Sequence, residues 1–380
     1  MQDEFILGIV SYPMAHAHEK AGIIDEALGI ASRGGRFRWR CGHSRTRSKK
    51  IWYNALSMQY KILSFNVLRM RSPVAGSAQS DGHPAEGCDE DVSSIIQSEG
   101  AMEQKYKKDW NAIAHMIRQS GAVIVALQEI LDDYCVERLQ RQLGGQWNFI
   151  VSDQVTIRNG GRDGYRYYEK YAFLWDERYV KVLHLDDPKK SGPHIETRFS
   201  SIKRPPYVAR FVPNTPGALP LMEIRVINTH IAFSVDRTTQ KRVPDMKDIP
   251  MRLKEYVTIA NKVFPKVAKE RDGYCAYTFV AGDYNLSCKH LMRLDGEIVP
   301  LQEDPTTLRR KFDSAESRRN PYLHNYDHFS ASRHEMPYVQ YAMRIDGICE
   351  TGKTPETYLK EVSDHVPIKL GFDVAASHWI

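Results

Sequence analysis

Six short apolar runs of the chain end or begin with an acid, an amide or an imidazole. In four of these places the polar residue follows the run, and in the other two it precedes the run. The residues that follow are Asn66, Glu129, His230 and the pair Asp283 and Asn285, and those that precede are Glu169 and the pair Asp364 and His365. A polar group at the mouth of a buried strand is held rigidly and still faces solvent, as a catalytic group must.

The residue types point to phosphoryl transfer assisted by a hard metal ion. Side-chain oxygens of Asn, Asp and Glu suit Mg²⁺, which binds one or two carboxylates and keeps several waters. His230 and His365 could transfer protons because imidazole titrates near neutral pH, and neighbouring carboxylates could orient the two rings. Each signature alone is more often a cap or a hydrogen-bonded structural residue. The six together, in this order, favour a catalytic site.

Short strands separated by helices must position these groups. Apolar runs predict strands at residues 60–67, 122–127, 171–175, 179–183, 207–212, 222–229, 277–281 and 366–372. Helical spacing of apolar residues predicts a helix that ends near Gly121, and further helices are expected at about 251–269 and 288–294. The chain has no GxGxxG segment, so this pattern predicts an α+β fold, a two-layered β-sandwich flanked by helices, and not a Rossmann fold.

The bulk composition is that of a globular protein with a large core. The 380 residues are 42% hydrophobic and 26% charged. No apolar run reaches the roughly 18 residues that a membrane-spanning helix needs, so no membrane span is expected. The N-terminus lacks the basic start and long apolar stretch of a secretory signal, and the six cysteines have no zinc-binding spacing. A cytoplasmic protein with reduced thiols is favoured over a secreted one.

The net charge of +6 is concentrated in one segment. Eight basic residues and no acid lie between Arg33 and Lys50, and without them the rest of the chain has a formal charge of −2. We therefore predict a disordered basic extension at residues 1–57, a catalytic domain at 58–374 and a tail at 375–380. A nucleic-acid-binding arm, a solvated tail and a translation start at Met58 are alternative interpretations of the extension. Residues 71–100 are expected to form a long surface loop.

Five segments resemble the motifs of the endonuclease/exonuclease/phosphatase superfamily. They are SFNVL, ALQEI, INTHI, AGDYNLS and VSDHVPI, which begin at residues 64, 126, 227, 281 and 362. The resemblance extends from Tyr60 to Phe372, about four-fifths of the chain. Three more segments, YYEKYAFLWD from Tyr167, KRPPYVARF from Lys203 and NYDHF from Asn325, resemble the DNase I-like branch of the superfamily.

The resemblance implies a role for each site residue. It assigns Asn66, Glu129 and Asp364 to a Mg²⁺ ion, for which Mn²⁺ can substitute, and allows a structural Ca²⁺. It implies acid–base catalysis by two histidines, each oriented by a carboxylate, with further groups on the phosphate and the nucleotide. These are His230 with Glu169, His365 with Asp327, Asp283 at the same phosphate site, Asn285 and Arg204 on the nonbridging oxygens, and Tyr167 beside the scissile bond. Asp346 is the less favoured alternative to Asp327.

The resemblance implies a monomeric, metal-dependent endonuclease that hydrolyses DNA. Two departures weaken the match to DNase I itself. Leu131 stands where members place a minor-groove Arg, which puts double-strand preference in doubt. His324 stands where the disulfide partner of Cys288 would be, so that bridge cannot form. The alternatives are a phosphomonoesterase or phospholipase acting on phosphoinositide or sphingomyelin, an abasic-site or exonuclease activity, and a non-catalytic binding protein.

Overall fold

The computed structural model describes residues 58–70, 108–159, 166–183, 192–197, 199–214, 222–233, 244–269, 275–294 and 296–374. The chain divides into two units, residues 1–53 and 54–380, and every described residue belongs to the second. The predicted basic extension, the loop at 71–100 and the tail at 375–380 lie outside the described residues, so the domain boundaries stay a prediction. Among the helices that the structure describes, none is long and apolar enough to cross a membrane.

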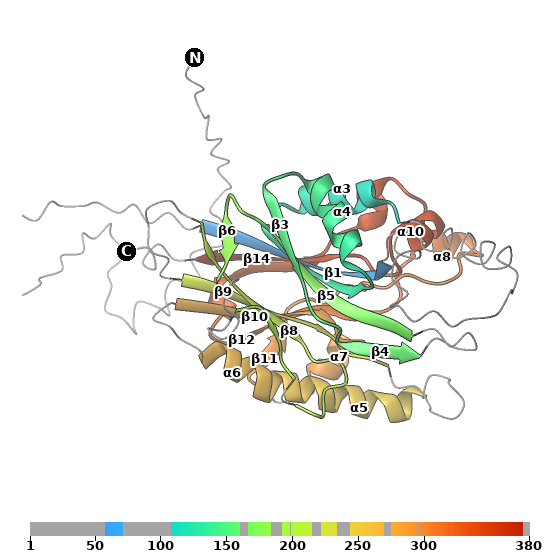
Figure 1. Cartoon of the computed structure of the whole chain (residues 1–380). Coiled ribbons are helices and arrows are strands. Elements are labelled where there is room, and N and C mark those ends of the chain that lie inside the picture. The colour runs from blue at the N-terminus through green and yellow to red at the C-terminus, as the bar shows by residue number, and fades with distance from the viewer. Residues whose placement is uncertain are drawn as a thin grey trace, which may run out of the picture. The chain divides into compact units, whose positions relative to one another are not determined.

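Two mixed β-sheets face each other (Figure 1). The first contains, in order, β13 (Val339–Arg344), β14 (Ile368–Val374), β1 (Met58–Met70), β2 (Ile124–Ile130), β5 (Arg166–Asp176) and β3 (Trp147–Val151), with β4 (Thr156–Asn159) on β5. The second contains β11 (Ile298–Pro300), β12 (Asp327–Ser332), β10 (Cys275–Asp283), β9 (Met222–His230), β8 (Tyr207–Pro213) and β6 (Val180–Val182), with β7 (His194–Ile195) on β8. The predicted α+β sandwich is confirmed.

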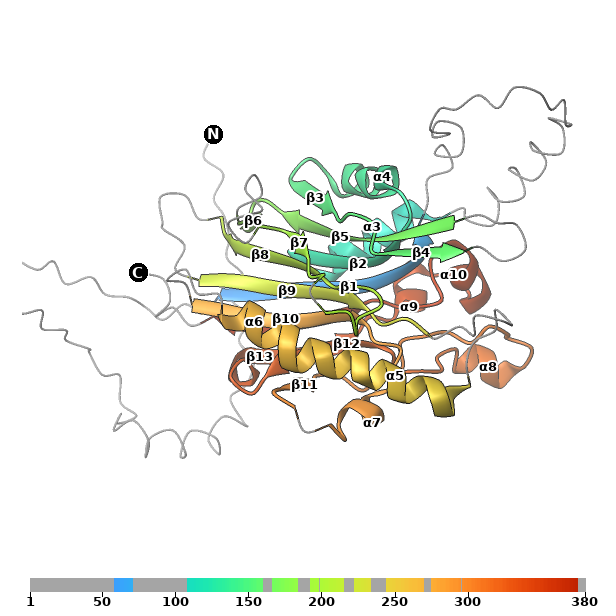
Figure 2. The same ribbon diagram turned by 60° about the horizontal axis from the view of Figure 1, so that its bottom comes forward.

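Helices cover the outer face of each sheet. Those packed on the first sheet are α3 (Trp110–Ser120), α4 (Asp133–Leu143), α9 (Gly347–Thr351) and α10 (Pro355–Glu361). A continuous helical segment crosses the second sheet, made of α5 (Asp245–Thr258), the π-helix η2 (Ile259–Val263) and α6 (Phe264–Lys269) (Figure 2). Two short helices, α7 (Cys288–Leu291) and α8 (Ala315–Arg319), and the 3-10 helix η3 (Met336–Tyr338) lie in connections.

The central strands are buried on both faces. Successive side chains of a strand point to opposite sides of the sheet. On β1, Ile62 therefore packs in the core between the sheets, whereas Leu63 packs in the core beneath α3 and α4. Every residue of β2 is buried. This double burial explains why these strands read as unbroken apolar runs in the sequence.

Several element boundaries differ from the prediction. The helix expected at 251–269 begins earlier, at Asp245. The prediction began too late because Pro250, which lies inside α5, interrupts the helical sequence pattern. The helix expected at 288–294 ends at Leu291. No sequence pattern predicted α4, α8 to α10, β3, β4, β7 or β11 to β13.

The strand registers bring distant polar residues together. β9 and β10 are parallel and pair His230 with Asp283, while β10 and β12 are antiparallel and pair Asp283 with Asp327. These three residues are therefore direct neighbours across three adjacent strands. Gly282 makes the approach possible: its φ is +146°, and a Cβ there would lie 1.8 Å from the carbonyl oxygen of Thr229.

Candidate active site

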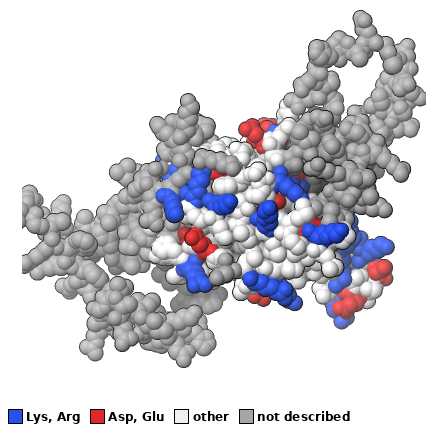
Figure 3. Space-filling model, turned by 90° about the horizontal axis from the view of Figure 1, so that it is seen from below, with Lys and Arg blue, Asp and Glu red and all other residues white. Residues whose placement is uncertain are grey.

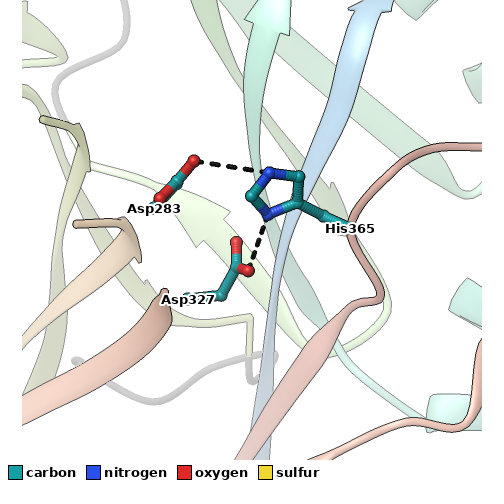
Figure 4. Close-up of side chains that lie close together, drawn as sticks. All are labelled: Asp283, Asp327 and His365. Atoms are coloured by element: carbon teal, nitrogen blue, oxygen red, sulfur yellow. Dashed lines mark hydrogen bonds and ion pairs between the residues drawn. The ribbon is translucent and has the colours of Figure 1, made fainter. Parts of the chain in front are cut away.

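His365 lies between two aspartates of the second sheet (Figure 4). Its Nδ1 is 2.8 Å from Asp327 Oδ2, and its Nε2 is 3.6 Å from Asp283 Oδ2. An ionised Asp327 fixes Nδ1 as the protonated ring nitrogen, which leaves Nε2 directed at Asp283. All three side chains are buried. Asp327 is held in turn by Thr306, whose Oγ1 accepts the Asp327 N–H at 3.0 Å.

A second histidine faces the same aspartate from the other side. His230 Nε2 lies 3.6 Å from Asp283 Oδ2, and His230 Nδ1 lies 3.9 Å from Glu169 Oε2. Glu169 also receives the guanidinium of Arg204, with Nε at 3.0 Å from Oε2 and Nη2 at 3.2 Å from Oε1. The His230 N–H donates to the hydroxyl of Tyr171, which fixes the backbone at the end of β9.

A third group of side chains comes from the first sheet. Asn66 Nδ2 donates to Glu129 Oε1 at 3.3 Å and to Asp283 Oδ2 at 3.1 Å, which links the two sheets. Glu129 has a φ of +60° and lies where the pairing of β2 with β5 shifts register between Leu127 and Ile130. A bulge of this kind redirects a side chain at the end of a strand. The backbone strain at Glu129 is of the sort that collects at functional sites.

Asn285 completes the arrangement on the side of the second sheet. Its φ is +49°, and its N–H donates to Asp283 Oδ1 at 2.8 Å. Its amide Nδ2 donates to the Ile231 carbonyl oxygen at 2.8 Å, just beyond the end of β9. The turn after β10 therefore folds back so that Asn285 lies beside Asp283 and near His230.

Burial and mutual charge set the protonation of the site. Burial, together with the nearby charge of Asp327, raises the pKa of Asp283 to about 7, although the charge of His365 opposes the rise. Burial alone would lower the pKa of His365, but the carboxylates of Asp327, Asp283 and Asp364 outweigh it and raise that pKa well above its ordinary value. The two groups therefore hold a proton near neutral pH in the metal-free protein.

Two sets of residues could hold a metal ion. Asp283, Asp327 and His365 each offer an atom within 4.8 Å of the others. Nδ1 of His365 already forms a hydrogen bond with Asp327, however, so we interpret this set as a group that transfers protons. The oxygen set of Asn66, Glu129 and Asp364 fits Mg²⁺ chemically. Glu129 Oε2 and Asp364 Oδ1 are buried without a hydrogen-bond partner among the described residues, so a cation ligated by them would satisfy both oxygens.

Other candidates take different places. The backbone of Tyr167 lies in β5, but the structure does not describe its side chain. Asp346 caps α9 by accepting the Cys349 N–H and also accepts the hydroxyl hydrogen bond of Tyr322 at 2.6 Å, and neither of these partners is a site residue. His328 is fully buried and contacts the carbonyl oxygen of Leu286 through Nε2 at 2.8 Å.

The sequence did not single out Lys108, which lies close to the oxygen set. Its Nζ donates to the Val362 carbonyl oxygen at 2.6 Å, and only 7% of the residue is exposed. Burial lowers the pKa of Lys108 to about 8, against the attraction of Asp364 and Glu129. The only sequence signal was its position just before the helix at Trp110, where a lysine is ordinarily solvated.

One curated protein and several solved structures are similar to this chain. No family model matches the chain. A curated deoxyribonuclease from Thioalkalivibrio sp. (strain K90mix) is 27% identical over 291 residues, which cover 71% of this chain and 68% of that protein. The chain is a distant homologue of that deoxyribonuclease. The two-sheet sandwich is the fold that the resemblance of the five motifs implied.

Two solved structures are similar to this chain at low sequence identity. An endonuclease/exonuclease/phosphatase family protein from Bacteroides thetaiotaomicron is 13% identical with a TM-score of 0.49, covering 86% of this chain and 99% of that one. A mannosyl-6-phosphatase from the same species is 12% identical with a TM-score of 0.44, covering 83% of this chain and 99% of that one.

Proposed function

We propose that the protein is a metal-dependent endonuclease that hydrolyses DNA phosphodiester bonds by in-line attack of water. One observation carries the proposal: His230 and His365 both direct Nε2 at Asp283 Oδ2, each at 3.6 Å, and each has a second carboxylate on its Nδ1 side. An in-line displacement needs one group that takes a proton from water and another that gives a proton to the leaving oxygen. Two carboxylate–histidine pairs around one point provide both.

The oxygen set would hold the metal ion. Asn66, Glu129 and Asp364 would bind Mg²⁺, or Mn²⁺ in its place, and the bound ion would polarise a phosphoryl oxygen and neutralise developing charge. Asn66 is positioned for this role by the first sheet and by Ser363, whose hydroxyl donates to the Asn66 carbonyl oxygen at 2.7 Å.

Two further side chains would bind the nonbridging oxygens of the phosphate. Arg204 is 2% exposed, and its Nη1 is buried without a hydrogen-bond partner among the described residues. A buried guanidinium nitrogen without an acceptor is costly unless an anion completes it. Asn285, beside Asp283, would donate its amide once substrate displaces the Ile231 contact. Both donors would stabilise charge as it builds in the transition state.

Two observations favour DNA as the substrate. The homologue carries the name deoxyribonuclease. The face that carries the α5 segment shows more Lys and Arg than acidic side chains (Figure 3). Exposed lysines of this segment are Lys247, Lys254, Lys262 and Lys269. Basic side chains attract the phosphate backbone without reading its sequence.

Plasmid nicking tests the proposal against its alternatives. Supercoiled plasmid, phosphoinositides and sphingomyelin are each incubated with the protein in Mg²⁺, in Mn²⁺ and in excess EDTA. We expect nicking in either metal, none in EDTA, and no lipid hydrolysis. His115→Ala, on α3 away from the site residues, is the matched control for His230→Ala and should nick like the wild type. Full activity in EDTA after verified metal removal, or lipid hydrolysis without nicking, would contradict the proposal.

A further inference from the structure

A stack of side chains lies on the rim of the active site. It consists of Arg252, Phe233, Tyr326 and His324, and is called the rim stack below. The rings of His324 and Tyr326 are parallel, with centroids 4.7 Å apart and 8° between their planes. Tyr326 meets Phe233 edge-on at 6.1 Å, and the guanidinium carbon of Arg252 lies 4.6 Å from the Phe233 centroid. These four residues therefore form one continuous set of ring contacts.

The rim stack joins the backbone segments that carry the catalytic groups. Tyr326 directly precedes Asp327, which holds His365, and Phe233 follows His230 by three residues. The N–H groups of Tyr326 and Asp327 both donate to Thr306 Oγ1, at 3.1 and 3.0 Å. Adjacent Cα atoms are about 3.8 Å apart, so Tyr326 starts one residue away from the catalytic carboxylate.

The stack is anchored at its inner end. The side chain of Arg252 is 3% exposed, and its Nε lies 3.0 Å from Oδ2 of the fully buried Asp248. Phe233 and Tyr326 are half-buried, whereas His324 is exposed. A buried ion pair thus holds the rings from behind, and the aromatic surface reaches solvent at the active-site rim. Rings held in this way lose little freedom when a ligand stacks on them.

We propose that the rim stack binds an unpaired nucleobase next to the scissile phosphate, and that the enzyme consequently prefers single-stranded DNA to an intact duplex. This inference rests on the proposed nuclease function. Aromatic rings stack on bases of any sequence, because every base has a π-face. In a duplex the bases stack on one another inside the helix and cannot reach such a surface without being flipped out.

Binding without turnover tests the stacking directly. A short single-stranded oligonucleotide that contains 2-aminopurine is titrated with protein in EDTA, where the fluorescence of the base reports stacking. We expect quenching by the wild type and by Tyr326→Phe, which keeps the ring. His324→Ala and Tyr326→Leu should each weaken binding by about 5- to 150-fold, the factor expected for one stacked base. Circular dichroism of each variant verifies that it is folded.

The chain offers a matched control in a second histidine–tyrosine pair. His334 is exposed and Tyr338 half-buried, with ring centroids 6.4 Å apart, and both lie beyond Ser332, the end of β12 farthest from Asp327. His334→Ala and Tyr338→Leu should leave the affinity for the oligonucleotide unchanged. Equal weakening by the control variants would show that the loss is not specific to the rim stack and would overturn the inference.

Cleavage provides the second readout and separates the two proposals. The ratio of kcat/KM for a single strand to kcat/KM for its duplex should exceed one, and should fall by about 5- to 150-fold in His324→Ala and Tyr326→Leu. Equal cleavage of both substrates, with no quenching and no effect of the variants, would overturn the inference while the nuclease proposal stands. Quenching that depends on His324 and Tyr326, without any DNA cleavage in Mg²⁺, would support base binding and overturn the nuclease proposal.

Discussion

Replacing Glu255 by Gln should stabilise the protein, and more at pH 7 than at pH 5. Glu255 lies on α5, is 2% exposed, and has one carboxyl oxygen without a hydrogen-bond partner among the described residues. Burial raises its pKa to about 8, although the N–H and the charge of Lys203 oppose the rise. Since Lys203 directly precedes Arg204, the same carboxyl supports the loop that carries the proposed phosphate-binding guanidinium.

The size of the effect follows from proton linkage. The unfolded chain loses the Glu255 proton near the ordinary pKa of 4.5, whereas the folded protein keeps it up to about pH 8. Stability from this group is therefore fully present below pH 4.5 and is lost as the pH rises from there to about 8. The loss is about 1 kcal/mol at pH 5 and about 3 kcal/mol at pH 7. Gln cannot ionise, so the variant avoids this loss. Its stabilisation relative to the wild type should therefore be about 2 kcal/mol larger at pH 7 than at pH 5.

Guanidinium chloride unfolding of both proteins at pH 5 and pH 7 measures this gain. Contributions from other groups are common to the two proteins and cancel in the difference. Glu137→Gln is the control for the exchange of carboxyl for amide, because Glu137 is exposed on α4 and pairs with Arg141. If Glu255→Gln changes the free energy of unfolding equally at both pH values, the buried carboxyl is ionised in the folded protein and the reasoning is wrong.

Three further predictions concern the site. His230→Ala and His365→Ala should each lower kcat in steady-state assays by about 10²- to 10⁴-fold. The decrease in kcat of the double variant should be smaller than the product of the two single decreases. Asp327→Asn should lower kcat. Asp346→Asn should leave kcat and Tm nearly unchanged, since Asn caps a helix about as well as Asp; a normal kcat in Asp327→Asn would contradict this. Lys108→Met should tighten Mg²⁺ binding by about two- to tenfold in calorimetry, because it removes a buried positive charge near two carboxylates.

The fold could be predicted where strands are buried on both faces. β1, β2, β9 and β10 lie at the centre of the sheets, so their sequences are apolar at nearly every position and their limits are visible. Edge strands such as β11 and β13 are short and only partly buried, and their patterns resemble those of loops. The prediction missed the part of α5 that precedes Pro250, since a helix usually does not continue through a proline.

The candidate site could be predicted for a related reason. Its residues follow or precede central strands, so the strand pattern located them and the registers of β9, β10 and β12 aligned His230, Asp283 and Asp327. Asp327 was the exception: it is the first residue of β12, a strand that the sequence pattern did not predict, and only the resemblance of the NYDHF segment identified it. Lys108 could not be found, because its partner Val362 lies 254 positions away in the chain.

The candidate catalytic residues and the rim stack are positioned in different ways. Most of the candidate catalytic groups lie at the ends of strands, whose hydrogen-bond ladders determine where each side chain lies. The rim stack is fixed by ring contacts between segments that are distant in sequence, and no local pattern links Phe233 to Tyr326 or Arg252 to Phe233. Strand-end residues can therefore indicate which reaction a site supports, whereas the proposed preference for unpaired DNA would depend largely on segments outside the sheets, which can change without disturbing them.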